Sequence, residues 1–232
     1  MTHVAIFGAG HQGQVALEIL QAAGRSVTAF VDKDRATSSG GTLASLPVWS
    51  EEQFERASRA DEMEVFVAIG NNNVRLHLSE RLREAGYRLC NAIHPSAVVM
   101  RSARLGTGIL LCPQAFVGAN SIIEDDAVIN TKASVDHDCH IGPGAYLAPG
   151  IITAGCVRVG RCAFIGIGAS LGPNVQVGDG AIVGAGALVL DSVGANAFVA
   201  GVPARFIRRM VPPVDWSAVL ARPPGLIEEP EE

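Results

Sequence analysis

The chain has 232 residues, 48% of them hydrophobic, and a formal net charge of −5 at pH 7. This length fits one large domain or two modest ones. The mild acidity and the lack of a basic block argue against nucleic-acid binding, and no apolar run approaches the ~18 residues of a membrane-spanning helix. Since the N-terminus also lacks a basic and apolar leader, we expect a cytoplasmic protein.

The first part of the chain alternates apolar strands with helical segments. Strands are expected over residues 3–10, 26–32, 63–70 and 87–93, helices over 12–23, 51–57 and 74–85, and a loop over 36–42. This alternation predicts a parallel sheet of βαβ units. His94-Pro95-Ser96 marks the end of this part, because proline disfavours the continuation of a helix or a strand.

A glycine-rich loop follows the first strand. Gly8-Ala9-Gly10-His11-Gln12-Gly13 fits G-x-G-x-x-G, and Asp32 closes the second strand. Backbone N–H groups of such a loop can hold phosphate oxygens, and the acid can accept hydrogen bonds from a ribose. Because this part is only about half of a full dinucleotide fold, a single nucleotide or a nucleotide sugar fits better than NAD. The alternative is a tight β–α turn that merely needs small residues.

A second glycine turn, Ala68-Ile69-Gly70-Asn71-Asn72-Asn73, ends another strand at what would be the same sheet edge. Its asparagines can contact a sugar or a base, or they can simply form the turn. The sequence leaves both interpretations open.

The central part of the chain repeats every six residues. From Val99 to Val189, every sixth residue is Val, Ile or Leu except Thr153, with a glycine often next and a small residue four places on. A helix would need apolar spacing near 3.6 and would not tolerate so many glycines. The period predicts a parallel β-helix in which residues 99–188 form triangular coils. The aliphatic residue would fill the prism, the small one would fit beside it, and the glycine would relax the corner.

His137 lies two places after the inward residue Val135, so its side chain belongs to a corner or outer face. Imidazole can take a proton from an amine at neutral pH, and Asp138 or Asp136 would orient the ring and raise its basicity. The alternative is a solvated turn histidine. His140 follows three residues later, but two histidines fall short of the three ligands of a zinc site, so no metal is predicted.

The cysteines of the repeat occupy places where small residues recur. We expect Cys112, Cys139, Cys156 and Cys162 to be packed thiols rather than disulfide partners or metal ligands, which suggests a reducing compartment.

Beyond the repeat, Arg205, Arg208 and Arg209 cluster after Gly201-Val202-Pro203. They either contact phosphates of a ligand or form a solvated charged end. Residues 211–232, rich in proline and acidic at the end, predict a loosely ordered extension.

Several motifs follow one another in a specific order. They are Ala68-Ile69-Gly70-Asn71-Asn72, Ile93-His94-Pro95-Ser96-Ala97, Ile129-Asn130-Thr131, Val135-Asp136-His137-Asp138-Cys139 and Gly201-Val202-Pro203-Ala204-Arg205. With them the chain resembles, over about residues 3–210, the sugar O-/N-acetyltransferases of the sialic-acid O-acyltransferase type. These include bacterial N-acetyltransferases of nucleotide-linked 4-amino-4,6-dideoxy sugars. The likeness is closer to those acting on GDP-perosamine than to those acting on UDP-sugars.

The resemblance implies an α/β Rossmann-like βαβ domain followed by an all-β left-handed parallel β-helix, an exception to the right-handed crossover rule. We expect a nucleotide-sugar-binding domain over residues 1–95, an acetyltransferase domain over 96–205 and a C-terminal extension over 206–232. The family's proteins are homotrimers that hold acetyl-CoA in the groove between neighbouring prisms.

The resemblance also implies roles for individual residues. His137 falls on the catalytic histidine and Asp138 on the acid after it. The implied CoA contacts are Asn130, Tyr146, Gly155, Ile167, Ala185 and, through phosphate, Arg205; the expected sugar-nucleotide residues are Gly8, Gly10, His11, Gln12, Asp32, Gly70 and Asn71. Two departures stand out. Tyr146 replaces a histidine found in many relatives near the acetyl end of CoA, and His11 precedes Gln12 and Gly13 where relatives have Gly-His-Gly.

The favoured hypothesis is an acetyl-CoA-dependent N-acetyltransferase acting on the 4-amino group of a nucleotide-linked deoxyamino sugar. The amine would attack the thioester directly while His137 takes its proton; no cysteine is placed as an acyl-carrying nucleophile, so we expect a ternary complex. The near alternative is O-acetylation of a sialic acid or another sugar hydroxyl. A nicotinamide-dependent oxidoreductase or a non-catalytic nucleotide-sugar-binding protein would rest on the glycine-rich loop alone.

Overall fold

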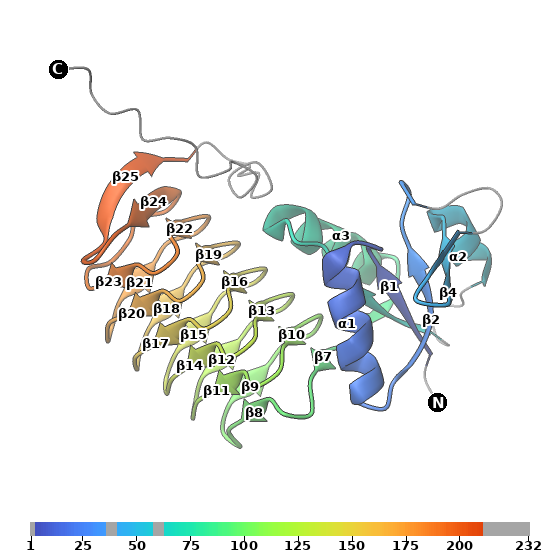
Figure 1. Ribbon diagram of the computed structural model, residues 1–232, viewed down its shortest axis with the longest axis horizontal. Helices are drawn as coiled ribbons and strands as arrows, with labels where there is room; N and C mark the ends of the chain where they lie inside the picture. The colour runs from blue at the N-terminus through green and yellow to red at the C-terminus, as the bar shows by residue number, and fades with distance from the viewer. Residues whose placement is uncertain (1–2, 36–40, 58–62, 211–232) are drawn as a thin grey trace.

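The computed structural model describes residues 3–35, 41–57 and 63–210 (Figure 1). An α/β domain lies at one end of a stack of triangular coils, and helix α1 runs beside the first coils. Together these two parts confirm the predicted fold class.

The N-terminal sheet has the strand order β3-β4-β2-β1-β5-β6, and all its pairs are parallel except β3 with β4. Its strands are β1 (His3–Phe7), β2 (Ser26–Val31), β3 (Gly41–Leu43), β4 (Leu46–Trp49), β5 (Met63–Val67) and β6 (Arg88–Leu89), and its helices are α1 (His11–Ala22), α2 (Glu51–Ala57) and α3 (Asn72–Glu84). In the part of the chain that is described, no helix has the length and apolarity that a membrane crossing requires.

Two local expectations for this domain were wrong. The strand expected over residues 87–93 is two strands, because β6 joins the N-terminal sheet whereas β7 (Ala92–Ile93) joins the β-helix. Of the loop expected over 36–42, residues 36–40 lie outside the described residues and the rest belongs to β3. The β3–β4 hairpin turns at Ala44 and Ser45, both with positive φ (49° and 65°). Such turns favour Asn-Gly, so the sequence carried no signal for this one.

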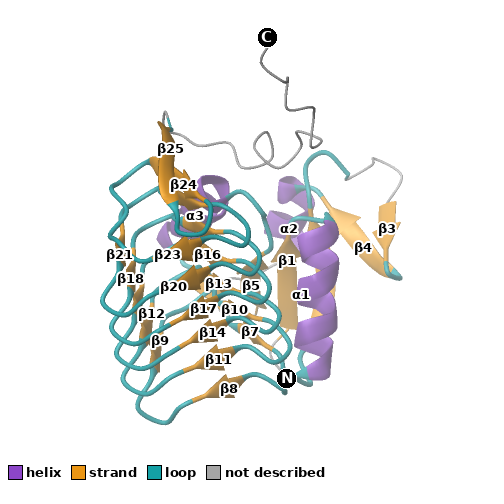
Figure 2. Ribbon diagram, turned by 60° about the vertical axis from the view of Figure 1, so that its left-hand side comes forward, coloured by secondary structure: helices purple, strands orange, loops and turns teal. Residues whose placement is uncertain are grey.

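The β-helix consists of three parallel sheets whose strands pair at intervals of 18 residues, for example Leu110 with Val128 (Figure 2). The first sheet contains β7, β10 (Leu110–Leu111), β13 (Val128–Ile129), β16 (Tyr146–Leu147), β19 (Phe164–Ile165), β22 (Ile182–Val183), β24 (Ala197–Ala200) and the antiparallel β25 (Arg205–Arg209). The second contains β8 (Val98–Val99), β11 (Phe116–Val117), β14 (Ser134–Val135), β17 (Ile152–Thr153), β20 (Ser170–Leu171) and β23 (Leu188–Val189). The third contains β9 (Arg104–Leu105), β12 (Ile122–Ile123), β15 (His140–Ile141), β18 (Arg158–Val159) and β21 (Gln176–Val177). The second residue of these two-residue strands points inward, so one apolar core runs along the prism.

The corners do not work as the sequence suggested. The left-handed backbone lies three places after the inward aliphatic residue, as at Asn120 (φ 59°) and Asp138 (φ 57°), and not at the glycine directly after it. That glycine is needed for close approach of neighbouring coils: a Cβ on Gly118 would lie 2.6 Å from the backbone carbon of Asp136. The repeat glycine therefore sets the spacing of coils rather than relaxing a corner.

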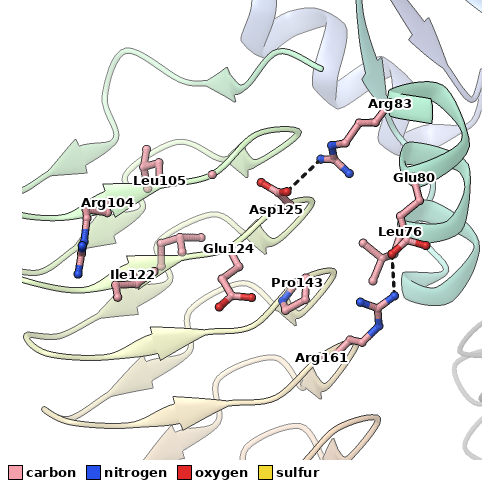
Figure 3. A pocket seen from close by; sticks show the side chains of 12 residues that line it. Leu76, Glu80, Arg83, Arg104, Leu105, Ile122, Glu124, Asp125, Pro143 and Arg161 are labelled. Carbon is pink, nitrogen blue, oxygen red and sulfur yellow. Dashed lines mark hydrogen bonds and ion pairs between the residues drawn. The ribbon is translucent and has the colours of Figure 1, made fainter. Parts of the chain in front are cut away.

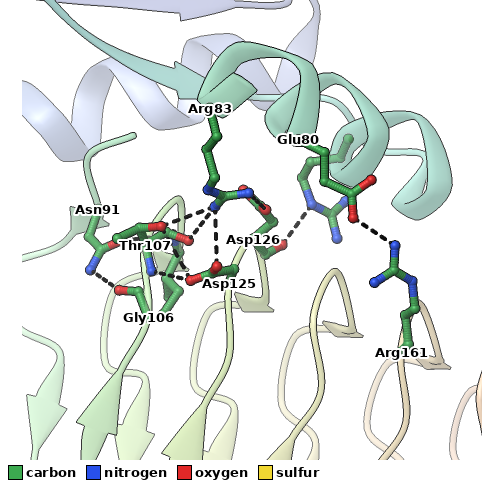
Figure 4. Close-up of polar contacts among 10 residues, drawn as sticks. Glu80, Arg83, Asn91, Gly106, Thr107, Asp125, Asp126 and Arg161 are labelled. Carbon is green, nitrogen blue, oxygen red and sulfur yellow. Dashed lines mark hydrogen bonds and ion pairs between the residues drawn. The ribbon is translucent and has the colours of Figure 1, made fainter. Parts of the chain in front are cut away.

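Polar contacts fasten α3 to the third corner of the coils (Figure 4). Arg83 pairs with the fully buried Asp126 at 2.8 Å, and Arg161 pairs with Glu80 at 2.8 Å. Arg75 is also buried, and it donates hydrogen bonds to the carbonyl oxygens of Asp126, Gly144 and Ile69. Burial lowers the pKa of Arg75 to about 10, against the opposing charge of Asp126. These contacts hold the two parts in one arrangement.

Beside this seam lies a cavity of about 640 Å³ with charged walls (Figure 3). It is lined by α3 and by residues of the first and third corners of the coils, among them Arg104, Glu124 and Arg161. None of the residues that the sequence predicted for catalysis or ligand binding lines it.

Candidate active site

The predicted catalytic pair sits in the corner between β14 and β15. The Nδ1 atom of His137 lies 2.8 Å from Oδ2 of Asp138, and both side chains are about half exposed (56% and 48%). The other carboxylate oxygen of Asp138 accepts a hydrogen bond from the Asn120 amide at 3.1 Å, and the backbone N–H of His137 donates to Asp136 at 2.7 Å. The ring is thus oriented from both sides.

The electrostatics of this corner suit a base. The hydrogen bond to Asp138, followed by the charge of Asp136, raises the pKa of His137, and the same bond together with Asn120 lowers the pKa of Asp138. An ionised Asp138 can only accept, so Nδ1 carries the proton and Nε2 keeps its lone pair. The pair can therefore take a proton at Nε2.

Gly155 lies directly against the ring of His137. A Cβ at this position would meet Cε1 at 2.4 Å and Nε2 at 2.5 Å. Any side chain here would displace the imidazole, so the glycine makes room for the ring. This requirement stands beside the CoA contact that the resemblance implied for Gly155, which stays a prediction.

His140 and Cys156 differ from the sequence-based expectation in opposite ways. Nε2 of His140 contacts Glu124, so the two histidines are held by different carboxylates. Cys112, Cys139 and Cys162 are buried as predicted, but Cys156 is exposed. It occupies a corner with positive φ (62°), not an inward place, and its thiol lies within 4.8 Å of the predicted base. The expectation that no thiol would stand there was wrong.

The glycine-rich loop opens into a cavity of about 630 Å³ between the α/β domain and the first sheet of the β-helix. Six of the seven expected sugar-nucleotide residues line it, namely Gly8, Gly10, His11, Gln12, Asp32 and Gly70. From the β-helix side, Cys112, Asn130, Thr131 and Tyr146 complete the wall. The seventh, Asn71, instead caps α3 by accepting from the backbone N–H groups of Asn73 and Val74, and it lines the neighbouring cavity.

The glycines of the loop have different causes. Gly8 has φ 106°, and a Cβ there would lie 2.7 Å from the carbonyl oxygen of Ala68. A Cβ on Gly13 would lie 2.1 Å from the carbonyl oxygen of Gly8. Both are required by packing alone, as the tight-turn interpretation proposed. A Cβ on Gly10 would meet nothing within 4 Å, so the fold does not need a glycine there.

Asp32 holds the loop itself. One carboxylate oxygen accepts from the backbone N–H of Ala9 at 2.8 Å, and the other accepts from Asp34 and Arg35 at 3.0 and 3.2 Å. The acid thus shapes the cavity, and any hydrogen bond to a ribose would be added to these.

A second, apolar cavity of about 580 Å³ lies along the same sheet. Three of the implied CoA residues, Tyr146, Ile167 and Ala185, line it, and Tyr146 also lines the first cavity. Asn130 donates to the Tyr146 hydroxyl at 2.7 Å, and the ring stacks on Phe164 with centroids 5.3 Å apart. Burial raises the pKa of Tyr146, so the phenol stays neutral. Arg205 is exposed in β25, where its guanidinium donates to the Ala204 carbonyl, and it lines neither cavity.

Sequence reasoning missed most of the apolar wall. Its aromatic and aliphatic members are Phe164, Ile182 and Phe198. The signal was present: Tyr146, Phe164 and Ile182 occupy the outward place of one sheet at intervals of 18 residues. The reading at intervals of six addressed only the inward row.

The two halves of the expected site lie on different corners of the prism. Ile167 and Ala185 follow the first sheet, whereas His137 and Gly155 follow the second. His137 lines neither cavity. Within one chain, the predicted base and the predicted ligand cavities are therefore separated by a whole sheet.

Comparison with known families agrees with this architecture. The model of the PglD N-terminal domain matches residues 3–82, and that of the bacterial transferase hexapeptide (six repeats) matches residues 156–191. Fold and site thus define a hexapeptide-repeat transferase that carries a PglD-type N-terminal domain.

Individual relatives are more specific. The chain is 40% identical to PerB from Caulobacter crescentus, solved with CoA and GDP-perosamine, over 90% of this chain and 98% of that one (TM-score 0.83). It is 32% identical to the acetyltransferase domain of PglB from Neisseria gonorrhoeae over 89% and 100% of the two chains (TM-score 0.82). The UDP-N-acetylbacillosamine N-acetyltransferase of Bacillus subtilis is 34% identical over 113 residues, which are 48% of this chain and only 51% of that enzyme. The chain belongs to this family of acetyl-CoA-dependent sugar N-acetyltransferases.

Proposed function

We propose that this protein transfers the acetyl group of acetyl-CoA to the 4-amino group of a nucleotide-linked deoxyamino sugar, of the GDP-perosamine or UDP-4-amino-sugar type. The observation that carries the proposal is the His137–Asp138 pair, whose Nε2 is free to take a proton. The relatives support the substrate class, since PerB was solved with CoA and GDP-perosamine and the Bacillus subtilis enzyme acts on UDP-linked bacillosamine.

In this reaction the sugar amine attacks the thioester carbon directly. His137 takes the proton that the nitrogen loses, Asp138 stabilises the imidazolium that results, and CoA leaves as the thiol. A backbone N–H stabilises the oxyanion of the tetrahedral intermediate. The raised pKa of His137 makes it a stronger base while leaving it largely neutral above that pKa.

The sugar nucleotide occupies the cavity of the glycine-rich loop. Gly10 leaves the backbone open to a diphosphate, and the first turn of α1 has no side-chain cap to compete for its N–H groups. The side-chain nitrogen of Gln12 is buried without a hydrogen-bond partner among the described residues. This supports Gln12, rather than His11, as the residue that contacts the sugar.

Acetyl-CoA occupies the apolar cavity. Its pantetheine arm packs along Ile167 and Ala185, and the acetyl end approaches Tyr146 and Asn130. Tyr146 supplies a flat wall where many relatives have histidine. Arg205 reaches the phosphates only by leaving its contact with the Ala204 carbonyl.

The active protein is a homotrimer in which neighbours complete each site. The outward row of the second sheet, which we call the apolar face, is Val98, Phe116, Ser134, Ile152, Ser170 and Leu188. Val98 and Ile152 are 51% and 55% exposed in the single chain. With three apolar faces around a threefold axis, the corner after one protomer's first sheet meets the corner after its neighbour's second sheet. This joins the ligand cavities to a neighbour's His137 and accounts for their separation within one chain.

We place the protein in the cytoplasm. All five cysteines are free, which fits a reducing compartment, and it needs no partner besides its substrates and its own copies.

A thiol-release assay with acetyl-CoA and a panel of GDP-, UDP- and dTDP-linked 4-amino sugars tests the proposal. We expect turnover with one amino sugar and none with its 4-hydroxy counterpart. Turnover with sialic acid or the 4-hydroxy sugar alone would make the enzyme an O-acetyltransferase, and NAD binding by calorimetry would revive the oxidoreductase. Gly10→Val should raise the KM for the sugar nucleotide and leave that for acetyl-CoA unchanged.

A further inference from the structure

Cys156 brings a third kind of ligand atom to the catalytic corner. One ligand atom each from His137, Asp138 and Cys156 lies within 4.8 Å of the others, and all three residues are exposed. His140, the partner considered from the sequence, is not a member of this group.

The stacking of coils explains this proximity. Asp138 and Cys156 are 18 residues apart and hold the same left-handed corner position (φ 57° and 62°) in successive coils. Parallel strands lie about 4.8 Å apart, so their side chains leave the prism side by side. The backbone N–H of Cys156 also donates to the His137 carbonyl at 3.0 Å, which fixes one corner on the other.

From this arrangement we propose that His137, Asp138 and Cys156 form a binding site for a thiophilic divalent cation of the zinc class. Imidazole nitrogen, carboxylate oxygen and thiolate sulfur are the donors that Zn²⁺ takes, and three protein ligands leave a fourth position for water or another thiolate. Ligand atoms of a tetrahedral zinc lie about 3–4 Å apart, from metal–ligand distances of about 2.0–2.3 Å. The three exposed side chains need only a small closure from their present separations.

Cation binding at this site opposes the proposed function, on which its inhibitory consequence rests. A metal held by the His137 ring replaces the proton or the lone pair that the base needs. Binding releases the Cys156 thiol proton, so the site fills more readily as pH rises. The free thiol of the CoA product is a ready fourth ligand, which would hold product and metal together in the groove.

Cobalt(II) titration of the metal-free protein tests the site without reference to catalysis. We expect one Co²⁺ per chain, with the visible bands of tetrahedral cobalt and a near-ultraviolet thiolate-to-cobalt charge-transfer band, displaced by Zn²⁺. Cys156→Gly suits the left-handed corner; it should abolish the charge-transfer band and weaken Zn²⁺ binding by at least about 100-fold. Asn174→Gly, at the same corner one coil further on, is the matched control and should bind like the parent.

The absence of the charge-transfer band in the parent protein, or its persistence in Cys156→Gly, would overturn the site. For catalysis, we expect Zn²⁺ to inhibit reversibly and Cys156→Gly to keep the uninhibited kcat while shifting the inhibition midpoint by the same factor of about 100. A cobalt spectrum that needs Cys156, combined with no inhibition by Zn²⁺, would support the metal site and instead contradict His137 as the base.

Discussion

Two outward faces of the same prism carry different chemistry. The apolar face contrasts with the charged face, which we define as the outward row of the third sheet: Arg104, Ile122, His140, Arg158 and Gln176. The inward residues of the two sheets are alike, all aliphatic except Thr153. The inward row therefore builds the coil, and the outward row decides what each face meets. The corner between these faces holds His137.

The largest effect should come from the base at this corner. We expect His137→Ala to lower kcat by about 10²–10⁴-fold, the range for a positioned proton transfer, with both substrates still bound. The loss should shrink as pH rises, because a larger fraction of the sugar amine is then unprotonated. His140→Ala, on the charged face, should stay within a few-fold. Steady-state kinetics of both variants decides it, and a dead His140→Ala beside an active His137→Ala would reverse the assignment.

The next effect concerns the apolar face. Ile152→Lys should convert the trimer to monomers, because a lysine would be buried without a partner at the threefold axis. Activity should fall at least about tenfold, since the base and the cavities then lie on separate molecules. Ile122→Lys makes the same change on the charged face and should leave a trimer. Light scattering that shows equal masses for the two variants would rule out this face as the interface.

A smaller effect should follow from the carboxylate behind the base. Activity requires neutral His137, so it falls as pH drops through the pKa that Asp138 raises. Asp138→Asn removes the main cause, which lowers that pKa and moves the acid limb of the kcat profile to lower pH. Its cost in kcat should stay below the about 10²-fold minimum for losing the ring. Glu124→Gln, beside His140, should leave the limb in place; measured in a chelator, a limb unmoved by Asp138→Asn would contradict the coupling.

The smallest effect belongs to the seam under α3. Arg161 and Glu80 form an ion pair that is about half exposed (50% and 43%). Arg161→Ala should therefore cost at most about 1 kcal/mol of unfolding free energy and leave kcat unchanged. Urea denaturation measures the loss, and a much larger value would mean that this pair, rather than the buried contacts of Arg75, holds the domains together.

Part of the site was within reach of the sequence. The glycine-rich loop and Asp32 follow from motif spacing, and the structure brings Gly8, Gly10 and Asp32 to one cavity. The spacing could not tell that Gly8 and Gly13 answer to packing while Gly10 does not, because that depends on which atoms surround each Cα. Nor could it show that Asp32 already accepts hydrogen bonds from the loop backbone.

The sequence by itself determined the prism, since inward burial at every sixth place is a local pattern that only a stack of short strands satisfies. It also indicated His137, because a histidine just outside the inward row has no core to fill. Only the tertiary structure decided that Cys156 stands beside that histidine and that Tyr146 lies between two cavities. Closure of each coil brings residues 18 apart into contact, and the twist and spacing of coils, rather than any local preference, select which side chains meet.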